Sequence, residues 1–362
     1  MSLLCDKYKP QKLDDLDFHK EQGKMLKQLS SNANFPHLFI YGPSGSGKKT
    51  RINALLFEMF GEASTRLKIE LKIFESASGR KTIQRIVSSN YHLEVNPSEN
   101  GFYDRVVVQE LIKDVATSGS LSKSHPFKVV VIVDADRLTK EAQQALRRTL
   151  EKYVSTCRLI LVGERSSRII PALKSRCFMV RNPAPDRTSM IDVMKYACTK
   201  ESVNVSDSVL EQIVDDYSDR NLRRALLLLQ TYFINVEAGG SSKVKIIPFK
   251  WLSLIDGLAK KMSESQSVKK VAEIRSTLYE LHTHLIPPEI ILRLLTNKLL
   301  TYCLDDQMRS NLINISAIVD HRIAQGSKPV IHLELFAVKF MSMFRCTVEK
   351  VAFDLDQSMD ID

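Results

Sequence analysis

Short apolar runs in the first half of the chain alternate with segments whose apolar residues recur at helical spacing. The runs at 37–42, 128–136 and 157–164 are continuous, which is typical of strands buried on both faces. The segments 48–60 and 139–153 follow two of these runs and carry the helical pattern. This alternation of strand and helix predicts a mainly parallel sheet that helices cover on both faces.

After residue 186 the continuous apolar runs end and helical spacing takes over. The segment AGGSSK (238–243) is the best candidate for a linker, because glycine and serine interrupt both periodic patterns there. The second half therefore predicts a small helical domain and a further helical domain beyond the linker. We expect helices at 187–200, 206–217, 221–233, from the proline pair 287–288 onward, and at 332–344.

Composition narrows the class of protein without deciding its function. The 362 residues suffice for two or three domains, and 44% hydrophobic with 26% charged residues is ordinary for a globular protein. No apolar run reaches the roughly 18–20 residues of a membrane span, and charge appears too early at the N-terminus for a secretory signal. Six cysteines without a C-x-x-C pair indicate neither a zinc site nor a disulfide framework, so we expect a reducing intracellular compartment.

The charge balance is basic, with 52 Lys and Arg against 42 Asp and Glu, a net charge of +10. The last nine residues (354–362) are acidic, so the rest of the chain is more basic still. This balance suits a polyanionic partner such as DNA or RNA. It fits an ordinary basic protein equally well.

The segment GPSGSGKKT (42–50) matches the phosphate-binding pattern G-x-x-x-x-G-K-[ST] at every position except the last. Its glycines allow tight turns that point backbone N–H groups at phosphates, and Lys48 adds charge near the β- and γ-phosphates. The next residue should carry a hydroxyl that holds Mg²⁺, but it is Lys49. We predict a nucleotide site that contains Gly42, Pro43, Ser44, Gly45, Ser46, Gly47, Lys48, Lys49 and Thr50.

The second predicted strand also departs from the pattern of an active ATPase. Such strands usually end in Asp-Glu-Ala-Asp, and this alignment places Val133 at the metal-binding Asp and Asp134 at the water-activating Glu. A shift of one residue would make Asp134 the metal ligand and leave Ala135 as the base, which is no better. The sequence therefore predicts a site that holds nucleotide without hydrolysing it. Whether the site also binds Mg²⁺ stays open, because Lys49 and Val133 replace the usual ligands of the ion.

These features occur together with other segments in a pattern that resembles AAA+ clamp-loader subunits. More narrowly, the chain resembles the divergent small subunit of eukaryotic replication factor C, whose ATP site is degenerate. The general resemblance rests on DKYKP (6–10), the strand and glycine loop (35–50), AQQALRRTLEKY (142–153), LKSRC (173–177) and NLRRALLLLQ (221–230). The narrower one rests on NYHLEVNPS (90–98), LIPPEII (285–291) and the region 326–341.

The resemblance implies an α/β P-loop AAA+ domain over 1–182 and a small helical lid over 183–240. It further implies an all-α collar that joins five subunits over 241–353 and an acidic tail, 354–362, without fixed structure. Such a subunit binds ATP or ADP and works in the nucleus during replication and repair. Its implied partners are the other subunits of a hetero-pentamer, the sliding clamp and primer–template DNA, with no membrane involved.

The same resemblance assigns roles to residues near both ends of the AAA+ region. Tyr8 and Pro10 match the segment that packs on adenine, and Leu4 stands where members often carry Trp, which implies a looser pocket. Arg223 matches sensor 2, which contacts the γ-phosphate. Glu164 falls at the sensor-1 position, where an acid would repel phosphates.

The motif Ser-Arg-Cys at 175–177 resembles the arginine finger that one subunit inserts into its neighbour's ATP site. A guanidinium supplied in trans stabilises transition-state charge and contributes about 10³–10⁵ in rate. We therefore expect Arg176 to be the catalytic contribution of this chain. The alternative for this residue is an ion-paired surface arginine at the end of a helix. For the whole chain, the alternative is an active AAA+ ATPase that acts on nucleic acid outside a clamp loader.

Overall fold

The computed structural model describes residues 2–359, apart from 33–34, 76–80, 118–126, 155, 240–245, 247–248, 304 and 327. For 102, 238–239 and 349–359 it describes the backbone alone. The chain forms two compact units, Met1–Ile247 and Pro248–Asp362. The finer boundaries expected at 182, 240 and 353 stay predictions. No helix in the described part is both long and apolar enough to cross a bilayer.

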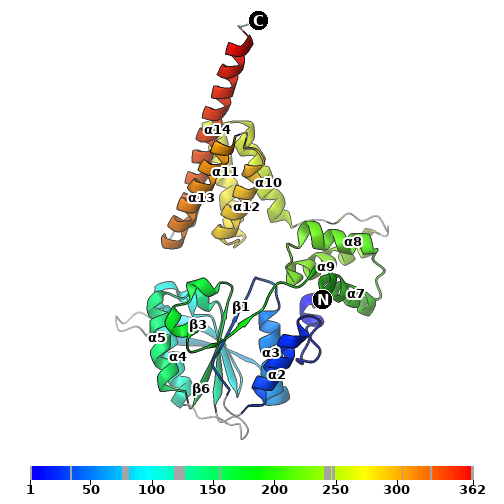
Figure 1. The fold of residues 1–362 in the computed structure, drawn as a ribbon, viewed down its shortest axis with the longest axis vertical. Helices are drawn as coiled ribbons and strands as arrows, with labels where there is room; N and C mark the ends of the chain where they lie inside the picture. The colour runs from blue at the N-terminus through cyan, green and yellow to red at the C-terminus, as the bar shows by residue number, and fades with distance from the viewer. Residues whose placement is uncertain are drawn as a thin grey trace. The chain divides into compact units, whose positions relative to one another are not determined.

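The first unit is built on one seven-stranded sheet with the strand order β2-β3-β4-β5-β6-β1-β7 (Figure 1). The strands from β4 to β7 are parallel, whereas β2, β3 and β4 pair in antiparallel fashion. The expected parallel sheet is confirmed, although four strands were not expected from the sequence. The strand bounds are β1 Leu38–Tyr41, β2 Lys68–Glu75, β3 Lys81–Ser88, β4 His92–Val95, β5 Lys128–Ile132, β6 Cys157–Gly163 and β7 Phe178–Arg181.

Helices cover both faces of this sheet because its central strands are apolar on both sides. In β1, Leu38 and Ile40 pack into one core, while Phe39 packs into the core on the opposite face. Figure 1 shows α4 and α5 on one side of the sheet and α2 and α3 on the other. These helices are α2 Lys20–Ser30, α3 Lys48–Phe60, α4 Asp104–Thr117 and α5 Lys140–Lys152, with the short helices α1 Leu4–Lys7 and α6 Pro171–Lys174.

Three further helices complete the first unit, and they match the expected helical segment after residue 186. They are α7 Arg187–Glu201, α8 Asp207–Gln212 with a π-helical turn at Ile213–Tyr217, and α9 Leu222–Gly239. Short 3₁₀ turns lie at Gly61–Ser64, Pro97–Tyr103, Ala135–Arg137 and Ser166–Arg168. Most of the proposed linker, 240–243, lies outside the described residues.

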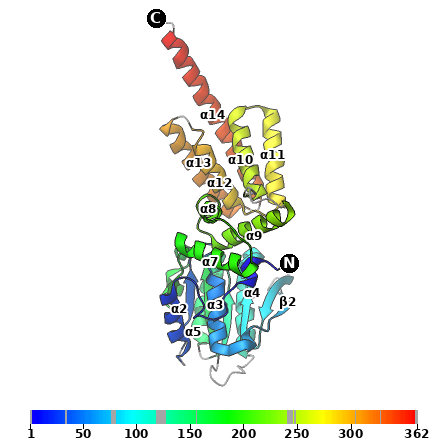
Figure 2. The ribbon, with the colours of Figure 1, turned by 90° about the vertical axis from the view of Figure 1, so that its right-hand side faces the viewer.

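The β2–β3 hairpin forms the outer edge of the sheet, where Figure 2 labels β2. Its two faces differ in exposure. Phe74 and Ile86 belong to the core that includes α4. On the other face Leu71, Ile73 and Ile83 are 71%, 62% and 63% exposed. Over 68–73 lysine or glutamate alternates strictly with an aliphatic residue, which is the period of a strand, but the aliphatic residues lie on the exposed face.

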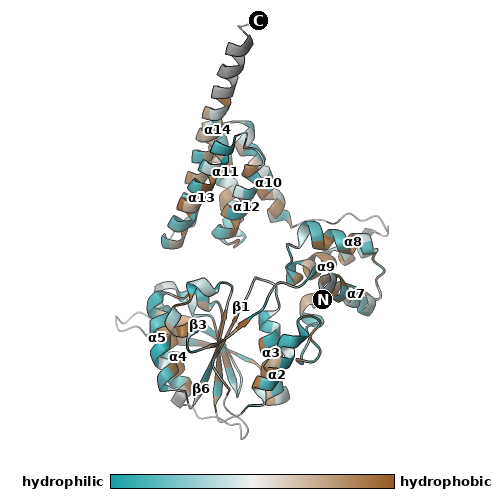
Figure 3. Cartoon of the chain, viewed as in Figure 1, coloured by the Kyte–Doolittle hydropathy of each residue, from teal (hydrophilic) through white to brown (hydrophobic). Residues whose placement is uncertain are grey.

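The second unit is entirely helical among its described residues. Its five helices share one apolar core, which includes Leu278, Leu295 and Phe336. The helix that begins at the proline pair is α12, and 332–344 lies within α14, as expected. Figure 3 shows the apolar positions of this unit, with hydrophilic residues between them. The helices are α10 Lys250–Glu264, α11 Val268–Thr283, α12 Pro288–Leu300, α13 Asp306–Gln325 and α14 Pro329–Met359.

The expected absence of fixed structure in the acidic tail, 354–362, stays a prediction, although part of this segment is helical. Helix α14 continues through Met359, so the backbone of 354–359 is helical. Residues 350–357 contain no proline or glycine that would end a helix, which is the local reason for this continuation. Residues 360–362 lie outside the described part of the chain.

Candidate nucleotide site and arginine finger

The glycine loop connects β1 to α3 at the carboxyl edge of the parallel strands, as expected from the sequence. Two of its glycines allow other groups to approach the backbone closely. A Cβ atom at Gly42 would lie 1.9 Å from the backbone oxygen of Asn182. One at Gly45, where φ is +73°, would lie 1.8 Å from Oδ1 of Asn221. No side chain fits at either position, so the loop requires glycine there.

A buried polar cluster around Asn182, the residue directly after β7, also supports the loop. Asn182 donates from Nδ2 to the backbone oxygen of Ser46 at 2.9 Å and accepts a hydrogen bond from Arg51. Arg51 is buried and also donates to Oε1 of Gln22 and to the carbonyl of Phe18, both at 2.8 Å. Burial lowers the pKa of Arg51 to about 10. These hydrogen-bond partners lie up to 136 residues apart, so sequence reasoning missed them.

The remaining loop residues take up the positions that the motif predicts. Ser46 is buried and donates to the carbonyl of Pro43 at 2.8 Å, and Ser44 is exposed. Gly47 precedes α3, and Thr50 lies in the first turn of that helix. The loop surface available to a phosphate therefore comes from backbone N–H groups and from lysine.

Lys48 places its ammonium group inside the loop. Its Nζ donates to the carbonyl oxygens of Gly42 at 2.6 Å and Pro43 at 2.8 Å. Burial lowers its pKa, while the negative charges of Glu164 and Asp136 oppose that shift. The ammonium thus lies close to the ends of β5 and β6, where catalytic residues of this class of site belong.

Lys49 points to a carboxylate that sequence reasoning did not anticipate. Its Nζ forms an ion pair with Glu94 in β4, a side chain that is only 15% exposed. Half-buried Lys9 lies in the same group: burial lowers its pKa most, and the nearby charge of Lys49 lowers it further. A positively charged cluster therefore lines one side of the glycine loop, with Glu94 as a counter-charge.

The position after β5 at which the motif places the Mg²⁺-binding carboxylate is Val133. Val133 is partly buried against the core beside α3. Asp134 adopts the left-handed conformation with φ +51°, and buried Asp136 accepts a hydrogen bond from the backbone N–H of Arg165 at 3.2 Å. Among the described residues no three acidic, histidine or cysteine side chains come together as metal ligands. Hard divalent cations take oxygen ligands, so Lys49 and Val133 make these residues a poor fit for Mg²⁺.

The N-terminal segment is attached to the helices that follow residue 186. Tyr8 donates from its hydroxyl to Glu201 at 2.7 Å, and Lys7 forms an ion pair with the same carboxylate at 2.6 Å. The hydrogen bond to Glu201 raises the pKa of Tyr8. Leu4 is buried and its N–H donates to Gln230 at 3.1 Å.

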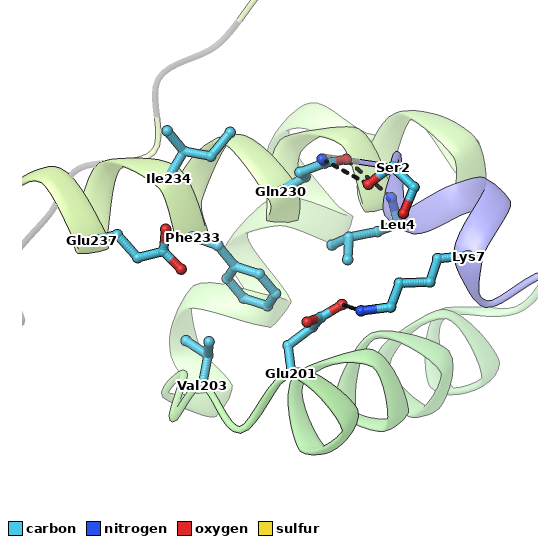
Figure 4. A pocket seen from close by; sticks show the side chains of 9 residues that line it. All are labelled: Ser2, Leu4, Lys7, Glu201, Val203, Gln230, Phe233, Ile234 and Glu237. Atoms are coloured by element: carbon cyan, nitrogen blue, oxygen red, sulfur yellow. Dashed lines mark hydrogen bonds and ion pairs between the residues drawn. The ribbon is translucent and has the colours of Figure 1, made fainter.

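A pocket of about 300 Å³ lies between α1, α7 and α9 (Figure 4). Leu4, at the position where family members often carry Trp, contacts α9 through its hydrogen bond to Gln230. Pro10, later in the same segment, is half-buried. Arg223, in the first turn of α9, is exposed, and its charge lowers the pKa of Lys9 and of Lys48. The pocket is lined by Ser2, Leu4, Lys7, Glu201, Val203, Gln230, Phe233, Ile234 and Glu237.

Arg176 lies at the amino ends of the parallel strands, whereas the glycine loop lies at their carboxyl ends. It precedes β7, whose first residue, Phe178, pairs with Leu38 at the start of β1, whereas the loop follows the end of β1. A four-residue strand spans roughly 13 Å. The guanidinium donates to Oε1 of Glu151 from Nε at 2.8 Å and lies 2.6 Å from it through Nη2. Arg176 therefore does not serve the glycine loop of its own chain.

Family models match three segments of the chain. The model described as replication factor C subunit 3, C-terminal domain, matches 251–348, and the one described as RCF1/5-like, AAA+ ATPase lid domain, matches 192–234. A model for the delta subunit of DNA polymerase III matches 18–185. The three segments follow one another along the chain without overlap.

Several curated relatives match over nearly their whole length. Replication factor C subunit 3 of Bos taurus is 42% identical over 96% of this chain and 98% of its own. Replication factor C subunit 5 of Neurospora crassa is 43% identical over 95% of this chain and 97% of its own. Replication factor C subunit 5 of Saccharomyces cerevisiae is 41% identical over 94% of this chain and 99% of its own.

Solved structures of a more distant protein share the fold. The RuvB Holliday junction branch migration motor of Thermotoga maritima covers 75% of this chain and 85% of its own, with a TM-score of 0.50 and 14% identity. The structure of a point mutant of the same motor protein has a TM-score of 0.51 at the same identity. At this identity the similarity concerns the fold alone.

Proposed function

Because the chain belongs to the replication factor C family of AAA+ clamp-loader subunits, we propose that it binds ATP or ADP without hydrolysing it. Its own contribution to catalysis is Arg176, which it supplies to the ATP site of a neighbouring subunit. The observation that carries this proposal is the place of Arg176, on the sheet edge opposite the chain's own glycine loop.

Nucleotide binding rests on the preserved half of the site. The loop keeps its glycines and its backbone N–H groups, and the bracing by Asn182 fixes its shape. Lys48 lies where a phosphate can replace the two loop carbonyls as its partner. Arg223 adds a second cation from α9. The resemblance to the family assigns the adenine side of the site to Tyr8 and Pro10. A site of this kind holds phosphates through backbone dipoles and fixed charge.

The loss of hydrolysis rests on the other half of the site. Hydrolysis requires a metal held by a hydroxyl and a carboxylate, together with a group that orients water. Lys49, Val133 and Glu164 stand at three of the positions that serve these steps. Lys49 is also committed to Glu94, so its ammonium is not free to move into the loop without leaving a poorly exposed carboxylate.

The partners follow from the family. We propose that the chain assembles with the other clamp-loader subunits into a hetero-pentamer through its helical second unit. The complex acts in the nucleus, where it opens the sliding clamp and loads it onto primer–template DNA during replication and repair. The net charge of +10 supports contact with the DNA backbone, which is independent of sequence and sensitive to salt.

The central test is the ATPase activity of the assembled complex with Arg176→Ala. The neighbouring site should lose about 10³-fold or more of its rate, so the complex loses that site's share of turnover. Nucleotide binding to this chain should stay intact. Arg187→Ala is the matched control, since Arg187 is also an exposed arginine paired with a carboxylate, Asp215. Unchanged turnover with Arg176→Ala refutes the proposed finger.

A second measurement separates a silent site from an active one. The isolated chain, given ATP and DNA, should bind nucleotide and show no turnover, and Lys48→Ala should abolish the binding. Turnover by the isolated chain that Lys48→Ala removes would establish an active ATPase with a rearranged metal site.

A further inference from the structure

Resting on the finger role of Arg176, we propose that Glu151 is a positioning residue that holds this arginine against its own chain. The carboxylate occupies the guanidinium until a neighbouring phosphate takes its place. Glu151 thereby lowers the population of free arginine and restrains ATP turnover in the complex before productive assembly.

The contact geometry shows a guanidinium with each of its three nitrogen atoms in contact with a group of its own chain. Nε of Arg176 lies 2.8 Å and Nη2 lies 2.6 Å from the same oxygen, Oε1 of Glu151. Nη1 donates to the carbonyl of Ala172 at 2.8 Å. Glu151 thus occupies the Nε/Nη2 edge of the guanidinium, so a phosphate that binds in a bidentate manner along this edge must displace Glu151.

The exposure of the pair makes exchange feasible. Arg176 is 35% and Glu151 is 50% exposed, so both partners remain in contact with solvent. Exposed ion pairs of this kind contribute only about 0.2–1 kcal/mol in general. A nucleotide phosphate group carries more negative charge than a single carboxylate, so it can displace Glu151 from this exposed arginine.

The place of Glu151 in its helix argues against a stabilising role in α5 itself. Glu151 lies in the last turn of α5, where the helix dipole disfavours a negative charge. Nearby cations must therefore offset its charge, and Arg176 is the closer of two. The other is Arg147, one turn earlier, whose Nε lies 3.9 Å from the same Oε1. When Arg176 leaves, Arg147 remains as a partner, so release does not strand an unpaired carboxylate.

The deciding experiment is Glu151→Gln in the assembled complex, with ATP turnover measured in the absence of DNA. Glutamine keeps the length and polarity of the side chain but removes the charge. Turnover should rise roughly 1.5- to 5-fold, the factor that corresponds to losing an exposed ion pair. Salt screens the pair, so the ratio of variant to wild-type turnover should fall towards one at high ionic strength.

The matched control is Glu141→Gln, which removes the same charge from the first turn of the same helix. Within the described part of the chain the ion-pair partner of Glu141 is Arg105, at a distance of 3.9 Å, so its substitution should leave turnover unchanged. The double variant Glu151→Gln, Arg176→Ala should show the low turnover of Arg176→Ala alone, because the carboxylate acts only through the arginine.

The outcomes separate this inference from the finger role. If Arg176→Ala lowers turnover but Glu151→Gln lowers it too, or matches Glu141→Gln, the holding role of Glu151 is refuted while the finger stands. If Arg176→Ala has no effect, the finger role itself fails. A salt-dependent rise for Glu151→Gln that vanishes in the double variant establishes the inference.

Discussion

The stability of the first unit should depend on pH through His37, which lies just before β1. Its Nδ1 accepts a hydrogen bond from the N–H of Leu159 in β6 at 3.0 Å, and its carbonyl accepts one from Phe178 in β7 at 2.7 Å. Burial, with a smaller contribution from the positive charge of Arg158, lowers the pKa of His37 from 6.5 to about 4. Protonation at Nδ1 must break the bond to Leu159.

The direction and size of the effect follow from linkage. The unfolded chain takes up a proton near pH 6.5, whereas the folded chain keeps His37 neutral down to about pH 4. The unfolded state therefore binds more protons in this window, and the free energy of unfolding falls as the pH decreases. At 1.36 kcal/mol per pKa unit, the loss between pH 7 and pH 5 is about 2 kcal/mol, and about 3 kcal/mol below pH 4.

The assay is urea unfolding of the chain between pH 5 and pH 7.5, compared with His37→Gln. Glutamine keeps an acceptor but does not titrate, so about 2 kcal/mol of the pH dependence should disappear in the variant. Burial also lowers the pKa of His92, whose contribution has the same sign and remains in His37→Gln. The exposed His321→Gln serves as the control. Equal pH dependence in wild type and His37→Gln refutes the reasoning.

Three further predictions concern the loop and the hairpin. Gly45→Ala should destabilise the first unit by about 1–3 kcal/mol and weaken nucleotide binding, since its Cβ would collide with Asn221; urea unfolding and nucleotide titration check this. EDTA should leave the affinity of the chain for nucleotide unchanged in calorimetry, and a strong dependence on Mg²⁺ contradicts the poor metal fit. Phe74→Ala should cost about 3–5 kcal/mol in urea unfolding. Leu71→Ala on the exposed face should change stability by less than about 0.5 kcal/mol, and equal losses would refute the assigned faces of β2.

Much of the fold follows from the local pattern of apolar and polar residues. The strands that this pattern did not predict were missed for physical reasons. The strands β1, β5 and β6 are continuous apolar runs because both of their faces are buried, so the sequence alone reveals them. Strand β7 escapes notice because its four residues are mostly exposed at the edge of the sheet. Strand β2 alternates apolar and charged residues, which is a period-2 pattern that the sequence analysis did not use.

In the candidate site, too, the residues of a local motif could be predicted, whereas their distant partners could not. The glycine loop is a local motif, so nine neighbouring residues could be predicted together. The groups that brace or pair with it come from distant parts of the chain: Asn182 directly after β7, Glu94 from β4 and Asn221 beside α9. Nothing in their local sequence marks them, since a hydrogen bond or ion pair across the fold depends on topology. The same holds for Glu151 as the partner of Arg176.

The proposed silent nucleotide site and the proposed arginine finger lie at opposite ends of the parallel strands. The substitutions that affect the nucleotide site, Lys49 and Val133, lie at the carboxyl edge of the parallel strands. Arg176 lies at the amino edge, beyond a strand of roughly 13 Å, which exceeds the Debye length of about 8 Å at physiological salt. Between exposed groups, charge changes at one edge are therefore largely screened at the other. The packing of α5, which holds Glu151, depends on the core shared with α4 rather than on the loop. A chain built this way can keep its arginine in place for a neighbour whether or not its own loop supports hydrolysis.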